Sequence, residues 1–176
     1  GLELYFADGF LVDPRLGGQG GRDIWVTRRA TLHDAWGPPV NLGPPVNSSA
    51  YEYAPFLAAD GLTILLTSNA RPGSGIGDDI WMARRGSLQD PWSQPVILGP
   101  PVSGSWVDAV PRLNASGSTL YFLSNRPGSL GQDIWKIDIL PIVDFNGDEL
   151  VDLADMSLLI NLWGTSETLC DIGPMP

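Results

Sequence analysis

Oxygen-bearing side chains recur at close, regular spacing between residues 144 and 155. They occupy positions 1, 3, 5, 9 and 12 of a twelve-residue segment whose position 7 adds a backbone carbonyl: Asp144, Asn146, Asp148, Leu150, Asp152 and Asp155. This is the ligand spacing of a calcium-binding loop, since Ca²⁺ takes about six to eight oxygens. The five carboxylates of the segment would repel one another without a cation. The sequence therefore predicts that these six residues bind Ca²⁺.

The residues that follow the predicted calcium loop are typical of a helix. An apolar stretch after the loop predicts a helix over 153–163 that ends at Gly164. Position 6 of the loop, usually glycine, holds Glu149. A non-glycine residue at positive φ costs roughly 1 kcal/mol or more. A single such loop is present, so we expect weak binding, with a dissociation constant of about 10⁻⁴ to 10⁻³ M.

Two acidic residues at equivalent positions form a second candidate site. Glu52 opens the sequence Glu-Tyr-Ala-Pro, and Asp108 opens the matching Asp-Ala-Val-Pro. Two interpretations stand. The acids converge on a central channel as an acid/base pair or a ligand or ion site, or each carboxylate caps nearby backbone N–H groups.

Both sites depend on repeated units in the rest of the chain. Asp-Ile-Trp occurs three times, starting at Asp23, Asp79 and Asp133, which are separated by 56 and 54 residues. Apolar runs, Pro-Pro-Val segments and turn residues recur in the same order around each copy. A fixed period of about 50 residues indicates stacked supersecondary units.

Each unit predicts four short strands. In the complete copy they span 54–58, 62–67, 79–85 and 94–98, and the second is apolar throughout, as expected for a strand covered on both faces. We therefore predict an all-β fold over 1–141, a partial β-propeller of about two and a half to three four-stranded blades. The array runs from the second strand of one blade to the third strand of the blade two further on, too few blades to close a ring.

The repeat resembles the WD40-like propeller repeat of TolB-type (PD40) proteins. The residues that carry the resemblance are Asp60-Gly61, Ser68-Asn69 and Arg71-Pro72-Gly73, followed by Asp-Ile-Trp. The first copy departs from this pattern and carries Gly9 to Arg22 in place of the turn. The resemblance implies a β-propeller used mainly to bind proteins or ligands, with no fixed chemistry.

Residues 142–176 resemble one half of a type I dockerin, truncated after the first loop and helix. The resemblance implies a small α-helical, EF-hand-like module that binds Ca²⁺ and docks onto a cohesin-like protein or a cell-surface scaffold. Leu153 and Ala154 stand where many dockerins place polar recognition residues, so cohesin specificity does not carry over.

Charge and composition narrow the function classes. The formal net charge is −10, and residues 144–176 contain seven acidic side chains and no basic one. This balance argues against binding the nucleic-acid backbone, which needs Lys and Arg. The sequence contains no span long and apolar enough for a membrane helix. Because it starts with glycine in the middle of a repeat, we expect a piece of a longer protein.

The recurring aromatic and basic residues can be explained by packing and by solvent exposure as well as by function. Trp25, Trp81 and Trp135 recur at one position, which favours packing between blades over sugar stacking. Trp36 and Trp92 lie beside prolines, where both packing and contact with sugar or protein remain open. The pairs Arg28-Arg29 and Arg84-Arg85 are expected to be solvated strand ends, as are most charged residues.

Together these features predict a non-catalytic binding scaffold of a secreted or envelope-exposed bacterial protein, located outside the cell, on its surface or in the periplasm. The propeller would bind a ligand, a polysaccharide among the candidates, or a protein, and the tail would dock. The alternative is a fragment of a polysaccharide-degrading glycoside hydrolase or lyase. Its chemistry would lie on Glu52 and Asp108 or in blades outside this sequence.

Overall fold

The computed structural model describes residues 1–9, 15–75 and 77–139. Contacts along the chain define two units, Gly1–Ile137 and Asp138–Pro176, and the described residues cover most of the first. The predicted calcium loop at 144–155 and the predicted helix at 153–163 lie outside the described residues. Among those described, no helix has the length and apolar character that crossing a membrane requires.

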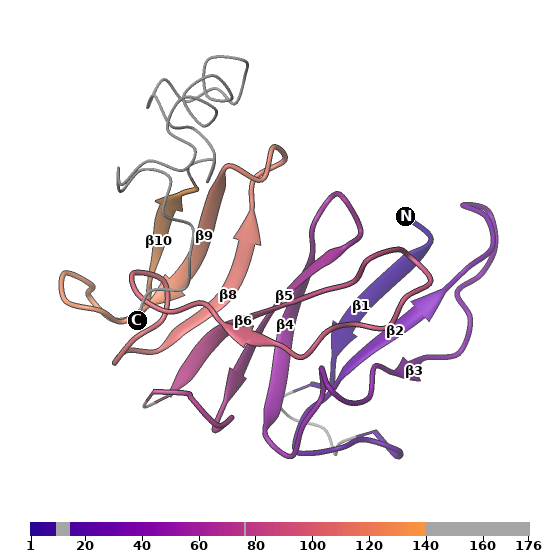
Figure 1. The fold of residues 1–176 in the computed structure, drawn as a ribbon, viewed down its shortest axis with the longest axis horizontal. Coiled ribbons are helices and arrows are strands. Elements are labelled where there is room, and N and C mark those ends of the chain that lie inside the picture. The colour runs from indigo at the N-terminus through magenta and orange to yellow at the C-terminus, as the bar shows by residue number, and fades with distance from the viewer. Residues whose placement is uncertain (10–14, 76, 140–176) are drawn as a thin grey trace, which may run out of the picture. The chain divides into compact units, whose positions relative to one another are not determined.

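The described part of the chain is all-β and contains three antiparallel sheets (Figure 1). Sheet 1 has the order β1-β2-β3, sheet 2 the order β4-β5-β6-β7, and sheet 3 the order β10-β9-β8. The strands are β1 (Glu3–Ala7), β2 (Ile24–Arg28), β3 (Val40–Asn41), β4 (Tyr51–Leu57), β5 (Thr63–Asn69), β6 (Asp78–Arg84), β7 (Val96–Ile97), β8 (Asp108–Leu113), β9 (Thr119–Ser124) and β10 (Asp133–Asp138).

The predicted four-stranded repeat is confirmed in sheet 2. All four predicted strands are present, although β4 begins three residues earlier than expected, at Tyr51, and β7 is confined to Val96–Ile97. Sheet 1 has counterparts of β5 to β7, and sheet 3 has counterparts of β4 to β6. The register agrees with this correspondence, because Phe6 pairs with Trp25 as Leu66 pairs with Trp81. The three described sheets do not close a ring.

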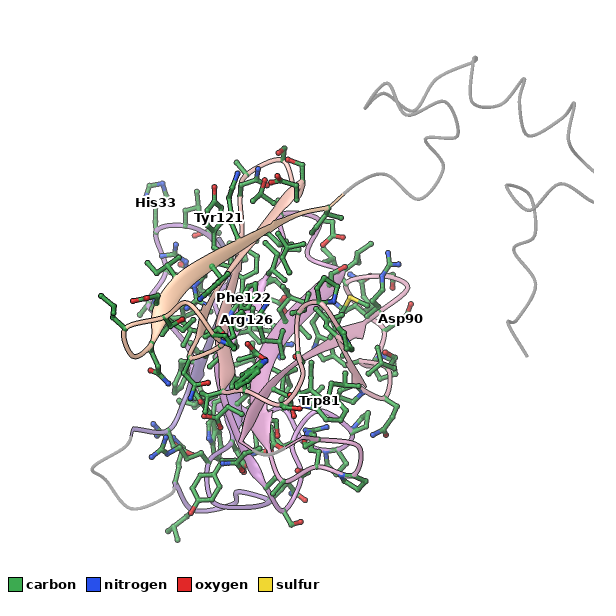
Figure 2. All side chains as sticks on the ribbon, turned by 90° about the vertical axis from the view of Figure 1, so that its left-hand side faces the viewer. His33, Trp81, Asp90, Tyr121, Phe122 and Arg126 are labelled. Carbon is green, nitrogen blue, oxygen red and sulfur yellow. The ribbon has the colours of Figure 1, made fainter. Side chains whose placement is uncertain are left out.

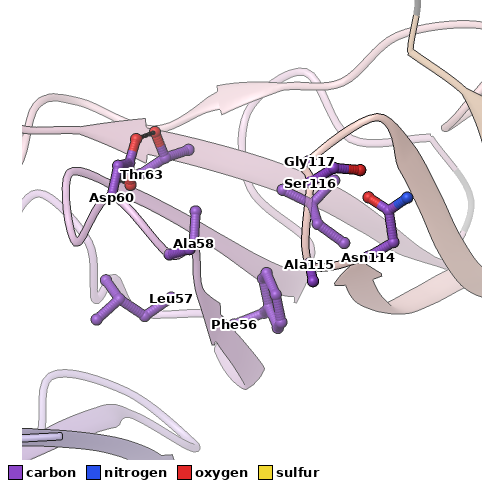
Figure 3. Close-up of a pocket in the computed structure, with 11 residues that line it drawn as sticks. Phe56, Leu57, Ala58, Asp60, Thr63, Asn114, Ala115, Ser116 and Gly117 are labelled. Atoms are coloured by element: carbon purple, nitrogen blue, oxygen red, sulfur yellow. Dashed lines mark hydrogen bonds between the residues drawn. The ribbon is translucent and has the colours of Figure 1, made fainter.

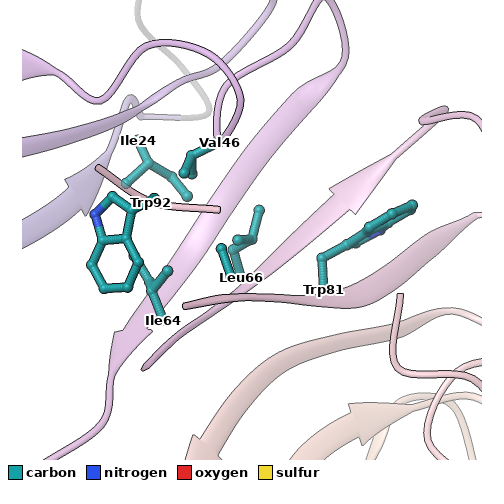
Figure 4. Packing of buried hydrophobic residues seen from close by; sticks show 7 residues of the cluster. Ile24, Val46, Ile64, Leu66, Trp81 and Trp92 are labelled. Atoms are coloured by element: carbon teal, nitrogen blue, oxygen red, sulfur yellow. The ribbon is translucent and has the colours of Figure 1, made fainter. Parts of the chain in front are cut away.

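Strand β5 is buried on both faces, as its unbroken apolar sequence predicts. Alternate side chains of a strand point to opposite faces. Ile64 and Leu66 pack with Ile24 of sheet 1 in one core cluster (Figure 4), and Leu65 packs with Leu120 and Phe122 of sheet 3 in another. Sheet 2 is therefore held between its two neighbours by apolar contacts on each side.

The first strands of sheets 2 and 3, β4 and β8, each carry a β-bulge. The register of β4 shifts between Tyr53 and Phe56, and that of β8 shifts at the equivalent place. At the bulges Ala54 has φ 49° and Val110 has φ 55°, a backbone region that β-branched residues rarely adopt. Such positions cost about 1–3 kcal/mol and persist only where the surroundings enforce them. Each bulge lies two residues after one of the two candidate acids.

Candidate functional site

The structure places both candidate acids in buried ion pairs. Glu52 pairs with Ser68 of β5 and Asp108 pairs with Ser124 of β9, and both acidic side chains are fully buried. Arg71 Nη2 lies 3.0 Å from Glu52 Oε1, and Arg126 Nη2 lies 2.7 Å from Asp108 Oδ1. A serine completes each group: Ser68 Oγ donates to Glu52, and Arg126 Nε donates to the equivalent Ser124 Oγ over 2.9 Å. We call each group an acid–arginine cluster.

The two arginines also tie down the Pro-Pro-Val loop that precedes each first strand. Arg126 donates to the carbonyls of Pro101 and Val102 at 2.9 and 2.7 Å, and Arg71 makes the equivalent bonds to Pro45 and Val46. The guanidinium carbons lie 5.5 and 5.4 Å from the ring centroids of Trp81 and Trp135. Each arginine thus binds an acid, a loop and an aromatic ring at once, with both polar and cation–π contacts.

The clusters leave the two acids with different capacity for a ligand. Glu52 also accepts hydrogen bonds from Ser48 N at Oε2 and from Ser48 Oγ at Oε1, so both its oxygens are hydrogen-bonded within the protein. Asp108 Oδ2 is buried and has no hydrogen-bond partner among the described residues. The acids lie in different sheets, and each is paired with its own arginine. Ligand binding by Glu52 and Asp108 stays a prediction.

Sheet 1 carries a variant of the cluster. Its described residues include no counterpart of β4, and therefore no acid at the position of Glu52. Asp8, at the position of Ser68, takes the place of that acid: it accepts a hydrogen bond of 2.9 Å from Trp25 Nε1 and lies 3.6 Å from Arg15 Nε. Arg15 lies over the Trp25 ring at 5.3 Å, as Arg71 lies over Trp81. The arginine–tryptophan contact is thus common to all three sheets.

Asp79 is a further buried acid that lies near Asp108. Burial raises the pKa of Asp79, the hydrogen bond from Gly75 N lowers it, and the negative charges of Asp108 and Asp78 raise it further. Asp79 Oδ2 accepts that bond from Gly75 N over 2.8 Å, and Asp79 Oδ1 has no partner among the described residues. Asp79 and Asp108 are thus two buried acids in neighbouring sheets, each with one oxygen that has no partner among the described residues. The negative charge of Asp108 adds to the burial that disfavours ionisation of Asp79.

Equivalent pockets open beside the two acid–arginine clusters. The first, of ≈510 Å³, and the second, of ≈440 Å³, are each walled by the Pro-Pro segment, the cluster arginine with its following proline, and the stacked tryptophan. The repeat therefore presents the same concave surface twice, once on each of two neighbouring sheets.

A third pocket, of ≈400 Å³, lies at the opposite end of sheets 2 and 3 (Figure 3). Phe56 and Leu57 supply apolar surface from the β4–β5 hairpin, and residues 113–117 line it from the β8–β9 hairpin. Asp60 caps its own turn, accepting bonds from Leu62 N and Thr63 Oγ1. The pocket combines apolar walls with a few polar groups at the rim, which is the usual composition of a small-ligand site.

The structure corrects one sequence-based expectation, for Arg85, and decides between the two interpretations that were open for Trp92. Arg85 is buried, not a solvated strand end, because it donates to the carbonyls of Gly61 and Leu88 and to Glu3 Oε2. Trp92 is also buried, against Tyr5 of sheet 1, with ring centroids 6.2 Å apart. Trp92 therefore packs between sheets, and its surface is not available to a sugar.

Sequence reasoning missed the roles of Arg71 and Arg126. The signal was present, since an acid at the start of one strand recurs with an arginine before Pro-Gly at the end of the next strand. Opposite charges that recur together indicate an ion pair. Within the described ranges, no three His, Cys, Asp or Glu side chains come together as metal ligands. No protein-family model and no curated protein matches this chain.

The Arg71→Met variant should lose about 3–5 kcal/mol of unfolding free energy, because it leaves Glu52 as an unpaired buried charge. Arg28→Met is the matched control: Arg28 also pairs with a glutamate, but its side chain is 53% exposed, so its loss should cost about 0–1 kcal/mol. Urea unfolding measures both. Adding Glu52→Gln to Arg71→Met should recover part of the loss. Equal effects of Arg71→Met and Arg28→Met would contradict the assignment.

Asp79→Asn should become more stable relative to the wild type as pH rises. The pKa of folded Asp79 is raised, so its contribution is fully present below the unfolded value and is lost as pH rises through the folded value. Asparagine stays neutral and escapes that loss. Unfolding free energies at about pH 4 and about pH 7 measure the difference. The exposed Asp90→Asn serves as control, and a difference for Asp79→Asn that stays constant or shrinks with pH would exclude this role of burial.

Proposed function

We propose that residues 1–141 are part of a β-propeller with WD40-like repeats, and that it acts as a non-catalytic binding scaffold. The support is the common plan of the three sheets, each with the same strand order and the same arginine–tryptophan contact. Propeller blades are four-stranded sheets that pack face to face around an axis. The two-sided burial of β5 is what that arrangement requires.

The acid–arginine clusters carry the non-catalytic part of the proposal. Glu52 is fully buried, and both its oxygens accept hydrogen bonds within the protein, from Ser48, Ser68 and Arg71. A general base must come within hydrogen-bond reach of a substrate proton, and a buried carboxylate held in this way does not. The equivalent pockets beside Arg71 and Arg126 instead suit a scaffold, because they offer the same surface on successive sheets.

The tail at 142–176 completes the proposal as a dockerin-like docking module. Its donor set contains only oxygens, the ligand type that Ca²⁺ prefers over transition metals. Asp144, Asn146, Asp148, Leu150, Asp152 and Asp155 would hold the ion. Neutralising the carboxylates would let the apolar segment that follows present a surface to a cohesin-like protein or a cell-surface scaffold. The protein would then work outside the cell, on its surface or in the periplasm.

Calcium titration of the full chain tests this tail. Calorimetry should detect binding with a dissociation constant of about 10⁻⁴ to 10⁻³ M, the range of extracellular calcium modules. Asp144→Asn and Asp155→Asn should each weaken it at least severalfold, because each removes a charged ligand. Asp171→Asn, outside the loop, should leave it unchanged. No heat of binding at millimolar calcium would remove the docking part of the proposal.

The alternative, a polysaccharide-degrading hydrolase or lyase, is favoured by one observation. Asp79 has a raised pKa and lies near the negative charge of Asp108, and each has an oxygen without a partner among the described residues. An acid of raised pKa near a second carboxyl group is the pairing that glycosidases use. The side chains of Asp79 and Asp108 are both buried, however, so a substrate would reach them only if sheets 2 and 3 moved apart.

Activity screening of the chain against plant and algal polysaccharides separates the two functions. The scaffold proposal expects binding without product release. If the alternative holds, product appears and is lost in Asp79→Asn or Asp108→Asn, while the exposed Asp90→Asn retains it. Glu52→Gln tests the remaining candidate acid in the same assay.

A further inference from the structure

One of the two equivalent pockets contains an aromatic side chain that the repeat does not require. Trp106 lines the pocket beside Arg126, and 41% of Trp106 is exposed. It stands two residues before Asp108, where the preceding repeat has Ala50 two residues before Glu52. Ala50 is buried and does not line the equivalent pocket. An exposed aromatic ring in a concave surface, where packing does not call for one, indicates contact with a ligand.

The opening of this pocket does not depend on where the described residues begin and end. One wall is the loop 100–106, which connects β7 and β8, and another includes Trp135, which packs in the core between sheets 2 and 3. The counterpart pocket belongs to sheet 2, which has its fourth strand and a described sheet on each side. Gln94 and Pro95, which lead into β7, also line that pocket, and it still has a volume of ≈510 Å³. A complete sheet with two neighbours therefore keeps this pocket open.

Arg126 supplies a hydrogen-bond donor to the pocket. It lies over Phe122, with its guanidinium carbon 4.8 Å from the ring centroid (Figure 2). Of its five N–H groups, one on Nε, one on Nη1 and two on Nη2 bond Ser124, Asp108 and two carbonyls of the Pro-Pro-Val loop. The second N–H of Nη1 has no acceptor among the described residues. The Arg126 side chain is 16% exposed, against 4% for Arg71, so Arg126 is the more accessible of the two arginines.

The free polar groups of the pocket suit a neutral ligand. Asp108 lies 2.7 Å from Arg126 and balances its positive charge, and the chain as a whole has a net charge of −10. Ser105 adds an exposed hydroxyl group that has no partner within the described ranges. A neutral ligand with hydroxyl groups of its own can accept a bond from the guanidinium and exchange bonds with the serine.

A sugar unit fits these groups better than a proline-rich peptide does. The C–H groups of a pyranose form an apolar face that packs on an indole ring, and its hydroxyl groups lie around the edge. Proline-rich peptides dock in grooves lined by aromatic rings. Here the guanidinium of Arg126 already lies over Trp135, at 5.4 Å from the ring centroid. Trp106 has no ring or cation contact in the part of the chain that the structure describes, so the pocket offers one free ring, which suits one sugar unit.

We propose that the pocket beside Arg126 binds a neutral sugar unit of a polysaccharide. Trp106 packs against the apolar face of the sugar ring, and Arg126 Nη1 and Ser105 Oγ bond its hydroxyl groups. The proposal rests on the scaffold function proposed above and specifies the ligand class and the site. It involves neither the outer faces of sheets 1 and 3 nor the calcium-binding tail.

Affinity electrophoresis of the full chain in native gels tests the proposal. Each gel contains one neutral polysaccharide (mixed-linkage β-glucan, xyloglucan or laminarin) or the acidic polygalacturonate. We expect at least one neutral polysaccharide to slow the wild type relative to a gel without polysaccharide, and polygalacturonate to leave its migration unchanged. A wild-type chain that no neutral polysaccharide slows, or that polygalacturonate slows more, would overturn the proposal.

Variants of the exposed tryptophans locate the site. Trp106→Ala should weaken binding at least about tenfold, the effect of losing a central aromatic contact. Its circular dichroism should match the wild type, because the side chain is exposed and the preceding repeat has alanine there. Trp106→Phe keeps a ring and should bind more tightly than Trp106→Ala. Trp36→Ala is the matched control: Trp36 is 39% exposed but lies outside the pocket, so binding should be unchanged. Ser105→Ala should weaken binding about two- to tenfold.

The outcomes separate this site from the scaffold function. Equal binding by Trp106→Ala and Trp36→Ala would overturn the site and leave the scaffold function to another surface. Binding of a decaproline peptide that Trp106→Ala loses, without binding of any polysaccharide, would overturn the ligand class alone. Release of sugar products would contradict the scaffold function and leave the Trp106 comparison valid. As a direct readout, saturating polysaccharide should protect tryptophan fluorescence from acrylamide more in the wild type than in Trp106→Phe, and equal protection would also overturn the site.

Discussion

The structure depends on one constraint: the central strand of each sheet is apolar on both sides. Burial of apolar surface, which contributes roughly 25 cal/mol per Å², is the main favourable term in folding. A sheet with two apolar faces cannot obtain that free energy alone, so it needs a neighbour on each side. Sheet 2 has both neighbours, and β5 is buried accordingly. Among the described sheets, sheets 1 and 3 have one neighbour each, and Leu4 and Ile134 on their outer faces are exposed.

Within this stack the cluster arginines fix the loops. Apolar faces are non-directional and could slide on one another, whereas a guanidinium group has five donors in a fixed plane. Arg71 and Arg126 use these donors on an acid, a serine and two loop carbonyls of their own repeat. The clusters therefore set how each Pro-Pro-Val loop and each first strand sit against the sheet that the apolar residues only bring together.

The fold was largely predictable because its signal is local and repeated. The Asp-Ile-Trp copies, the apolar runs and the turn residues identified every strand of sheet 2 and the truncated sheets on either side. The candidate site was less predictable, because burial of Arg85 and Trp92 depends on contacts with residues far away in the sequence, such as Glu3 and Tyr5. Trp36 has the same sequence context as Trp92 but is exposed, whereas Trp92 is buried against sheet 1. The sequence around each tryptophan does not show whether another sheet covers it.

A partner that bound both of the equivalent pockets beside Arg71 and Arg126 would be held more tightly than one that bound a single pocket. They lie on adjacent sheets of one compact unit, so their spacing is fixed by the repeat itself. A polymer that presents one chemical group at that interval would engage the second pocket at an effective concentration of about millimolar once the first is filled. Avidity of this kind favours binding of a polymer over binding of its monomer, even where each single contact is weak.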